Sequence, residues 1–326
     1  MSRAERSAPH AAVAPVSPDS DRDAFRSDVL AGLAAHPKAL PAKYFYDAAG
    51  SRLFDAICEL DEYYPTRTEL KILKAHAGDI AARAGDGATL VEFGAGSLVK
   101  VRILLEALSA PAAYVPIDIS HDHLLAASNL LAREYRSLSV LPLVADFTRA
   151  VRIPPHAGRQ MLGFFPGSTL GNFTPTEATA FLRQAGETLG PGALFVLGID
   201  LKKDTRRLEA AYNDRKGVTA AFNLNLLARI NRELNGSFDL SAFRHKAVFN
   251  ATEGRIEMHL ESLSDQRVEV DGQSISFAAG ETIHTENSYK YSTDEITARA
   301  RDAGWHMEQV WTDAHALFAV CLLKRA

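Results

Sequence analysis

Residues 88–97 form the stretch of this chain best suited to binding a ligand. They read Ala-Thr-Leu-Val-Glu-Phe-Gly-Ala-Gly-Ser, an apolar run that ends in an acid and a Gly-x-Gly turn. Gly94 and Gly96 let the backbone turn tightly and approach a ligand without a Cβ in the way. A dinucleotide fingerprint would need a further glycine where Val99 stands, which disfavours a nicotinamide-dependent oxidoreductase. The turn predicts a nucleotide-type site, although a purely structural turn remains the alternative.

Acidic residues follow the next two apolar runs at corresponding positions. Asp118 lies at about the 20-residue spacing from Gly94 at which a carboxylate accepts ribose hydroxyls. Asp146 and Phe147 follow the third run, where an acid can accept the adenine amino group and a ring can cover the base. Lys100 could neutralise a ligand carboxylate or be a solvated charge. Each aspartate could be an ordinary loop or N-cap residue, but their common register favours a nucleotide site.

Glu286 and Ser288 form a second pair of polar residues at a regular spacing. One residue separates them, so in an extended segment they project from the same face and Asn287 projects from the other. A carboxylate accepts hydrogen bonds and a hydroxyl can donate or accept, so the pair could hold a polar ligand. The alternative is a surface strand, since glutamate and serine are usually exposed.

An aromatic-rich segment near the N-terminus could belong to a pocket or to a core. Its members are Tyr44, Tyr46, Phe54, Tyr63 and Tyr64. Clustered aromatic residues more often form core. Ring faces and hydroxyls, however, can also hold a cationic nitrogen of a ligand.

The elements that must position these residues follow an α/β pattern. Helical and strand patterns alternate from about 67 to 200, which predicts a parallel sheet. Strands are expected at 88–93, 113–118, 138–144, 160–166 and 193–200, with helices at 67–84, 98–109, 121–135 and 175–189. Thr66 and Glu69 fit a capping box at the start of the first helix. A helix at 292–303 and strands near 305–311 and 316–323 could close the sheet as an antiparallel hairpin.

Residues 201–290 interrupt this alternation. They begin with helical patterns at 205–213 and 218–234 and then turn into strands, of which Arg255-Ile-Glu-Met-His-Leu-Glu alternates with period two. The expected fold is therefore α/β, a Rossmann-like sheet with an inserted α+β substrate-binding domain. The expected division is a disordered tail at 1–20, a nucleotide-binding domain at 67–200 plus 291–326, and a substrate-binding domain at 21–66 plus 201–290.

Bulk composition limits the possible classes of function. The chain of 326 residues is 47% hydrophobic and 23% charged, as in globular proteins. Its net charge of −4 has no block of like charges, so neither a nucleic acid nor a membrane is expected as a partner. Cys58 and Cys321 lie far apart without a Cys/His cluster, which argues against disulfides and zinc and favours a cytoplasmic protein. The oligomeric state stays open, a monomer included.

Several long motifs give the chain a resemblance to a known enzyme family. They are Lys43-Tyr-Phe-Tyr-Asp-Ala-Ala-Gly-Ser-Arg-Leu-Phe-Asp, Glu62-Tyr-Tyr-Pro-Thr-Arg-Thr-Glu, Gly167-Ser-Thr-Leu-Gly-Asn-Phe-Thr-Pro, Gly217-Val-Thr-Ala-Ala-Phe-Asn, Arg255-Ile-Glu-Met and Thr285-Glu-Asn-Ser. From about residue 24 to the C-terminus, the chain resembles the histidine-specific methyltransferases that depend on S-adenosylmethionine (SAM). The turn at Gly94 likewise resembles motif I of class I SAM methyltransferases.

The resemblance implies a reaction and a role for individual residues. It implies the class I methyltransferase sheet, SAM as cofactor with S-adenosylhomocysteine as product, and no metal or nucleophilic residue. The matching SAM contacts are Gly94, Lys100, Asp118, Asp146 and Phe147. The positions that match holders of the amino acid's amine and carboxylate are Tyr63, Asn172 and Tyr212. Glu286 and Ser288 match the pair that grips the imidazole, and Tyr46 and Met258 match positions that line its pocket. An imidazole offers two N–H groups when protonated, or one donor and one acceptor when neutral, so a carboxylate can accept from one nitrogen and a hydroxyl can serve the other.

The implied activity is the trimethylation of the α-amino group of L-histidine, through its mono- and dimethyl forms, to the histidine betaine hercynine. This is the first step of ergothioneine biosynthesis. One alternative is the same fold acting on another amino acid or aromatic amine, such as tryptophan. Indole has one N–H and no second ring nitrogen, so a Glu/Ser pair suits it poorly. Another alternative is a non-catalytic SAM-binding module.

Overall fold

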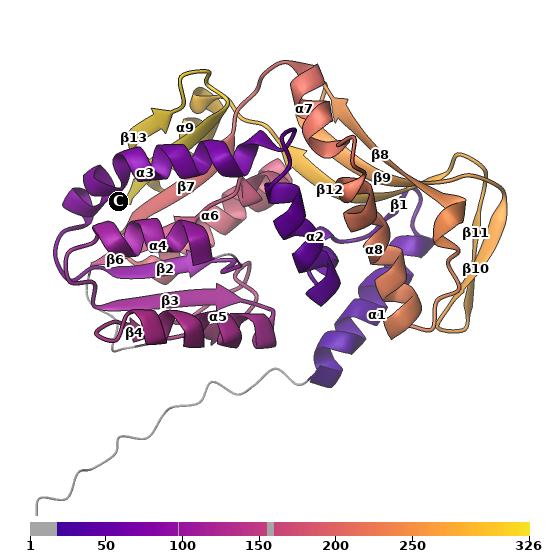
Figure 1. Cartoon of the computed structure of the whole chain (residues 1–326), viewed down its shortest axis with the longest axis horizontal. Helices are drawn as coiled ribbons and strands as arrows, with labels where there is room; N and C mark the ends of the chain where they lie inside the picture. Colours follow the sequence, from indigo (N-terminus) through magenta and orange to yellow (C-terminus); the bar gives the residue numbers. More distant parts are fainter. Residues whose placement is uncertain (1–17, 97, 155–159) are drawn as a thin grey trace, which may run out of the picture.

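The computed structural model describes residues 18–96, 98–154 and 160–326, which form two lobes placed side by side (Figure 1). The larger lobe is built on an eight-stranded sheet in the order β13-β14-β7-β6-β2-β3-β4, with β5 paired to β3. Its strands are β2 (Thr89–Phe93), β3 (Ala113–Asp118), β4 (Ser139–Val140), β5 (Leu143–Val144), β6 (Met161–Phe165), β7 (Leu194–Asp200), β13 (Trp305–Thr312) and β14 (Phe318–Arg325). Only β14 runs antiparallel to its neighbours β7 and β13. The expected class I methyltransferase sheet and its closing hairpin are confirmed.

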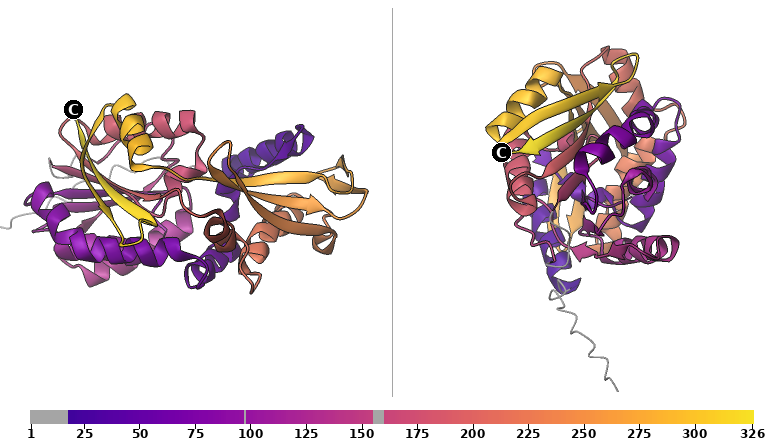
Figure 2. Two further views of the ribbon diagram at one scale, coloured as in Figure 1. Left: turned by 90° about the horizontal axis from the view of Figure 1, so that it is seen from above. Right: turned by 90° about the vertical axis from the view of Figure 1, so that its left-hand side faces the viewer.

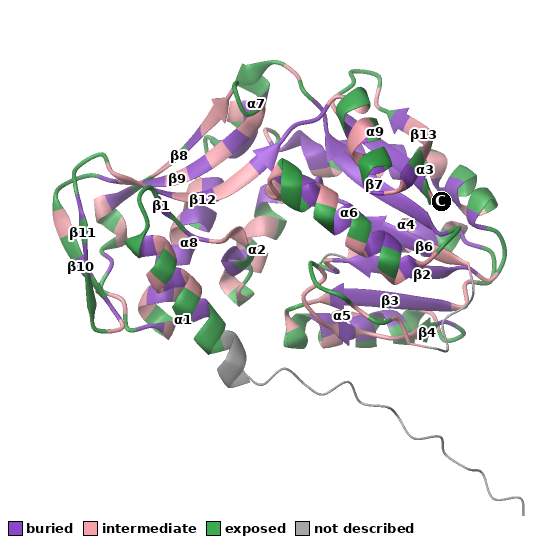
Figure 3. Cartoon of the chain, turned by 180° about the vertical axis from the view of Figure 1, so that it is seen from behind, coloured by how far each residue is buried: buried purple, intermediate pink, exposed green. Residues whose placement is uncertain are grey.

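Helices cover both faces of this sheet, which explains why its central strands are buried. Strand β2 is buried at every residue. On one face pack α3 (Tyr64–Ala84), α4 (Leu98–Ala107) and α5 (His121–Glu134). On the other face pack α6 (Pro175–Leu189) and α9 (Thr293–Asp302), which Figure 3 shows from behind. None of the helices in the described ranges combines the length and apolar character that crossing a membrane needs.

The smaller lobe holds a four-stranded sheet in the order β1-β12-β9-β8. Its strands are β1 (Lys38–Ala39), β8 (Phe243–Asn250), β9 (Arg255–Ser262) and β12 (Thr282–Tyr289), and β10 (Gln266–Val270) pairs with β11 (Gln273–Phe277) as a separate hairpin. The helices of this lobe are α1 (Pro18–Ala34), α2 (Ala48–Cys58), α7 (Thr205–Tyr212) and α8 (Val218–Glu233). Short 3-10 turns are η1 (Ala42–Phe45), η2 (Thr169–Asn172) in the larger lobe and η3 (Leu240–Ala242). The predicted alternation along β9 is confirmed, because its residues are buried at every second position.

Three boundaries differ from the expectation. Helix α3 begins at Tyr64 rather than 67, because its proline occupies the first turn, and the cap at Tyr63 makes no side-chain hydrogen bond. The capping box predicted at Thr66 and Glu69 is therefore wrong, and both side chains bond elsewhere. The single strand expected at 138–144 is split into β4 and β5. The expected tail, 1–20, lies outside the described residues except for 18–20, which begin α1.

The two lobes meet where the chain leaves the large sheet and where it returns. The outgoing segment after β7 and the incoming segment after β12 run in parallel through a bridge between Leu201 and Tyr291. The Tyr291 amide donates to the Asp200 carbonyl at 3.1 Å, and the Lys202 amide donates to the Tyr291 carbonyl at 3.0 Å. Figure 2 shows these connections crossing between the lobes. The end of β12 is thus held directly beside the carboxyl end of β7.

Candidate active site

The Gly-x-Gly turn lies at the carboxyl end of β2, tied to the neighbouring strand. The amides of Gly94 and Ala95 both donate to the Ile117 carbonyl, at 2.8 and 3.1 Å. Gly94 has a φ of +73°, and a Cβ there would stand 3.3 Å from the ring of Phe147. Only glycine suits this combination of left-handed backbone and close ring. The structure thus brings the turn and Phe147 together, as the sequence predicts, while Ser97 lies outside the described residues.

Both predicted acids lie at strand ends on the same edge. Asp118 is the last residue of β3, where it accepts the Ser120 amide at 2.8 Å, and burial raises the pKa of its carboxyl. Asp146 follows β5 and accepts the amide and hydroxyl of Thr148 on one oxygen, at 2.9 and 2.6 Å. Its other oxygen has a loose 3.6 Å ion pair with the exposed Arg149. Asp146 therefore shapes its own turn and still has one carboxylate oxygen for a ligand.

Lys100 is not a solvated charge. Its ammonium lies 2.6 Å from a carboxylate oxygen of Glu69, a residue with no exposed surface. Both Glu69 oxygens also accept the Gly167 amide at 2.9 Å, just after β6. A Cβ at Gly198 would stand 2.0 Å from the Glu69 carboxylate, so that strand position has to be glycine. Glu69 thus joins α3, α4 and the β6 loop, and the capping-box interpretation concealed this role.

A β-bulge decides the direction of Glu286. A regular strand that starts from buried Ile283 would turn Thr285 inward and Glu286 outward. The pairing of β12 with β9 slips between His284 and Glu286, so that Glu286 stands opposite Met258. Thr285 is the extra residue, and its hydroxyl bonds to Asn223 at 2.8 Å and to the Met258 carbonyl at 3.1 Å.

Because of this bulge, Glu286 and Ser288 share the inner face of the small sheet, as predicted. Ser288 stands opposite Ile256, and both are buried along with Met258. Glu286 is half-buried, and the surrounding protein raises the pKa of its carboxyl to about 7 despite the opposing effect of Lys290. At pH 7 about half of such carboxyl groups are ionised and able to accept a hydrogen bond at both oxygens.

Aromatic residues surround this carboxylate. Tyr46 lies beside Phe54 and Phe222, with ring centroids 5.7 and 5.9 Å away. It keeps 39% exposure, yet burial and the nearby Glu286 raise the pKa of its phenol well above the ordinary value. The ring therefore borders accessible space while protein encloses it on the other sides. Part of the aromatic segment belongs to the core, as Tyr64 does, and part lies near Glu286, as Tyr46 does.

Tyr63 and Tyr212 belong to the same group. Their rings meet edge to face with centroids 6.2 Å apart, and both residues are 8% exposed. The Tyr212 hydroxyl lies 2.7 Å from Ser288 Oγ, which links the end of α7 to β12. Burial raises the pKa of both phenols, so both are neutral hydrogen-bonding groups. The predicted pair of tyrosines and the Glu/Ser pair thus form one cluster.

Asn172, the remaining predicted substrate residue, belongs to the larger lobe. It ends η2, the turn that follows β6, and it is half-buried. The cap of the next helix is Thr174, which forms a capping box with Glu177, so Asn172 is not that cap. A Cβ at Gly171 would stand 2.7 Å from the Tyr289 carbonyl. The glycine therefore lets η2 pack against the end of β12, next to Ser288.

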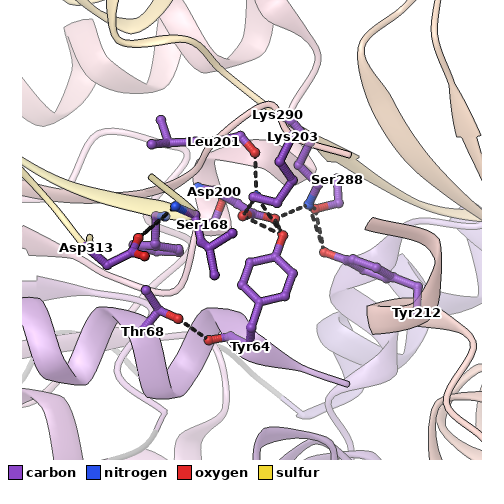
Figure 4. Close-up of polar contacts among 12 residues, drawn as sticks. Tyr64, Thr68, Ser168, Asp200, Leu201, Lys203, Tyr212, Ser288, Lys290 and Asp313 are labelled. Carbon is purple, nitrogen blue, oxygen red and sulfur yellow. Dashed lines mark hydrogen bonds and ion pairs between the residues drawn. The ribbon is translucent and has the colours of Figure 1, made fainter. Parts of the chain in front are cut away.

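Sequence reasoning missed a buried charged group beneath this cluster (Figure 4). Lys290 Nζ lies 2.8 Å from Asp200, and neither residue has any exposed surface in its side chain. Lys203 ion-pairs with the same carboxylate and donates to the Tyr64 hydroxyl at 2.7 Å. Burial alone would raise the pKa of Asp200, but Lys290 and Lys203 hold it below its ordinary value. Extending the two-residue period from Glu286 and Ser288 would have pointed to Lys290.

A hollow elsewhere in the larger lobe does not belong to this site. A hollow of about 460 Å³ lined by Val151, Ile153, Met161 and Glu187 lies by the start of β6, at the opposite end of the strand from η2. Over the described ranges, no three His, Cys, Asp or Glu side chains gather as metal ligands would.

The chain is similar in sequence to known proteins. The chain is 44% identical to the histidine N-alpha-methyltransferase of Mycolicibacterium smegmatis over 94% of its length and 97% of that protein. It is 42% identical to the histidine N-alpha-methyltransferase of Mycobacterium tuberculosis, with the same coverage of 94% and 97%. It is also 29% identical to ergothioneine biosynthesis protein 1 of Neurospora crassa, over 85% of this chain and 32% of that protein. Residues 25–325 match the family described as histidine-specific and SAM-dependent methyltransferases. The chain belongs to the family of histidine-specific, SAM-dependent methyltransferases.

Proposed function

We propose that this enzyme transfers three methyl groups to the α-amino nitrogen of L-histidine and so forms hercynine, the first intermediate of ergothioneine biosynthesis. The observation that carries the proposal is the bulge in β12, which turns Glu286 toward the same inner face as Ser288. A carboxylate and a hydroxyl on one face match the two nitrogens of an imidazole. Family membership supports the methyl transfer and its histidine substrate.

The residues at the strand ends of the large sheet fit SAM. Because Gly94 has no Cβ, its backbone lies close to the Phe147 ring. This backbone and the aromatic ring would contact the adenosine moiety. Asp118 would accept the ribose hydroxyls, and Asp146 has one carboxylate oxygen for the adenine amino group. Lys100, held by Glu69, would face the methionyl carboxylate. When bound, SAM supplies an activated methyl group on a sulfonium and leaves as S-adenosylhomocysteine.

The substrate would lie between side chains that the two lobes contribute. Tyr63, Tyr212 and Asn172 would hold its amine and carboxylate, because they bring hydroxyl and amide groups from both lobes to the inner face of β12. Tyr46 and Met258 would line the ring pocket around Glu286. Two neutral phenols suit a nitrogen that becomes cationic and loses its N–H groups as methyl groups accumulate.

The protein's part in the reaction is alignment. Direct displacement by a neutral amine needs nitrogen, methyl carbon and sulfur in line, and it requires no nucleophilic side chain. The ring contacts of Glu286 and Ser288 and the polar contacts of Tyr63 and Asn172 would fix the amine toward the glycine-turn edge. Exclusion of water by the surrounding aromatic residues would keep that geometry through three transfers.

The domain roles and the cellular location expected from the sequence are also part of this proposal. Residues 67–200 plus 291–326 would form the SAM-binding domain, and 21–66 plus 201–290 the substrate-binding domain. Cytoplasmic placement is supported by the free thiols of Cys58 and Cys321. The partners would be L-histidine and its mono- and dimethyl forms.

Incubation of the purified enzyme with L-histidine and SAM tests the proposal. We expect mass spectrometry to detect products with one, two and three added methyl groups on the α-nitrogen. Glu286→Ala should reduce the discrimination of histidine over tryptophan by about 2–4 kcal/mol, because a charged hydrogen-bond partner is lost. Methylation of another amine with none of histidine would favour the indole-amine alternative. SAM binding without turnover of any amino acid would indicate a binding module.

A further inference from the structure

Lys290 has its full hydrogen-bonding capacity committed inside the protein. Its ammonium lies 2.6 Å from Ser288 Oγ, 3.1 Å from the Tyr212 hydroxyl and 2.8 Å from Asp200 Oδ2. Burial alone would lower the pKa of Lys290, but Asp200 raises it well above the ordinary value, so the group is charged. An ammonium has three N–H donors and no lone pair. All three contacts are therefore donated by Lys290.

This donation fixes the hydrogens of the two hydroxyls. Ser288 Oγ and the Tyr212 oxygen each accept from Lys290 and lie 2.7 Å from one another, so one of them must donate to the other. A phenol is the stronger acid and, with its lone pairs delocalised into the ring, the poorer acceptor. Tyr212 then donates to Ser288. The serine oxygen has accepted two hydrogen bonds, and its own hydrogen remains for a third partner.

We propose that Lys290 is a positioning residue that makes Ser288 a hydrogen-bond donor to the substrate ring and thereby selects the neutral imidazole. The inference rests on the proposed function. Glu286, on the same face, accepts from the N–H of the ring, and Ser288 donates to the nitrogen that carries the lone pair. A protonated ring would point a second N–H at the serine hydrogen. An indole would have no nitrogen to accept it.

Lys203 provides a matched control for this role. It is buried and ion-paired to the same Asp200 carboxylate as Lys290. Its hydrogen bonds within the described part of the chain go to Asp200, the Tyr64 hydroxyl and the Leu201 carbonyl, away from Ser288 and Tyr212. Replacing either lysine by methionine removes one ammonium from Asp200, but only Lys290→Met frees the two hydroxyls to reorient.

Steady-state kinetics at saturating SAM, with calorimetric binding of S-adenosylhomocysteine, test the proposal. We expect Lys290→Met to raise the KM for histidine by about tenfold or more, with little change in kcat or in the affinity for S-adenosylhomocysteine. Lys203→Met should leave that KM within about threefold of the wild type. Lys290→Met should add little to Ser288→Ala in the double variant, because both changes remove the same hydrogen bond.

A ring-analogue comparison on the wild-type enzyme keeps the test independent of variant folding. The two thiazolylalanine regioisomers carry an acceptor nitrogen at one or other imidazole position, and the thienylalanines of the same shape carry a C–H there. One thiazolyl compound should inhibit histidine methylation at least about tenfold more strongly than its thienyl counterpart.

Distinct results would overturn the positioning role. These are equal inhibition by all the analogues, an unchanged histidine KM in Lys290→Met, equal KM effects of Lys203→Met and Lys290→Met, or additive effects with Ser288→Ala. In each of these cases the wild type still methylates histidine, so the proposed function survives. A wild type that binds S-adenosylhomocysteine but never methylates histidine would remove both.

Discussion

Glu286 is a carboxylate that must leave water yet stay able to accept a hydrogen bond. Burial raises the pKa of Glu286 to about 7, and Lys290 is the charged group that opposes this rise. The nearby phenols of Tyr46, Tyr63 and Tyr212 stay neutral, because burial raises the pKa of each. The ionised carboxylate therefore prevails above about pH 7 and is lost as the pH falls through that value.

This titration predicts a pH dependence specific to Glu286. Between pH 8 and pH 6 the ionised fraction of a group with a pKa of about 7 falls by about tenfold. We expect the ratio of kcat/KM for histidine between wild type and Glu286→Gln to fall by a similar factor over this range. Dividing the two profiles cancels the titration of the substrate's own amine and ring. A ratio that stays constant from pH 6 to 8 would contradict the assigned role.

The sequence contains enough information to find the polar face but not what lies beneath it. Two-residue spacing correctly placed Glu286 and Ser288 on one side of a strand. Lys290 and Asp200 escaped notice because lysine and aspartate are almost never fully buried unless they are paired. Their pairing joins residues far apart along the chain, which a local pattern cannot reveal.

At the scale of elements, the bulge in β12 turns Glu286 to the inner face of the small sheet, and the Thr285 hydroxyl anchors that bulge. Thr285→Val keeps the shape of the side chain but leaves the buried Asn223 oxygen without this donor. We expect a loss of about 1–3 kcal/mol in the free energy of unfolding and a higher KM for histidine. Binding of S-adenosylhomocysteine should be unchanged.

The control is Thr282→Val, the same replacement at a half-buried position on the same strand. Urea denaturation and histidine kinetics on both variants make the comparison. Equal effects of the two replacements would show that the Thr285 hydroxyl does not anchor the bulge.

The glycine turn allows a second test at this scale. Gly94 has a φ of +73° and lies against Phe147, whereas a Cβ at Gly96 would meet none of the described residues within 4 Å. In the ligand-free enzyme, Gly94→Ala should therefore lower the free energy of unfolding by about 1–2 kcal/mol, the cost of a left-handed alanine. Gly96→Ala should leave it nearly unchanged. Urea unfolding curves with the same destabilisation in both variants would argue against the conformational role of Gly94.

Elements with strong periodicity were predictable, and those shaped by tertiary contacts were not. The strands and helices of the large sheet lie close to their expected ranges because apolar runs and turn residues mark them. The expected strand at 138–144 breaks because Pro142 cannot donate a ladder hydrogen bond. The bulge in β12 has no glycine or proline to announce it, since it depends on Asn223 of a distant helix.

At the scale of the molecule, the ion pair between Asp200 and Lys290 lies where the lobes join. Asp200 ends a strand of the large sheet, and Lys290 follows the last strand of the small one. The same contact that involves Ser288 therefore ties the small lobe to the large one. An insertion between two strands of a sheet was visible in the sequence, but the charged contact that couples it to the sheet was not.

Removal of Asp200 should weaken this coupling. Asp200→Ala leaves the ammoniums of Lys290 and Lys203 buried without their carboxylate, which costs about 3–5 kcal/mol. Both tryptophans of the chain, Trp305 and Trp311, lie on β13. Their fluorescence reports the large lobe alone, whereas far-ultraviolet circular dichroism reports both lobes.

In the wild type the two signals should follow one urea transition, as they do when a protein unfolds as a unit. In Asp200→Ala we expect a lower midpoint and two curves that no longer coincide, because the lobes unfold separately. Glu134→Ala, which breaks the exposed pair with Arg102, should change the free energy of unfolding by less than about 1 kcal/mol and keep the curves together. Coincident curves in Asp200→Ala would mean that apolar packing and the backbone bridge alone join the lobes. The pair would then serve only the hydroxyls of Ser288 and Tyr212.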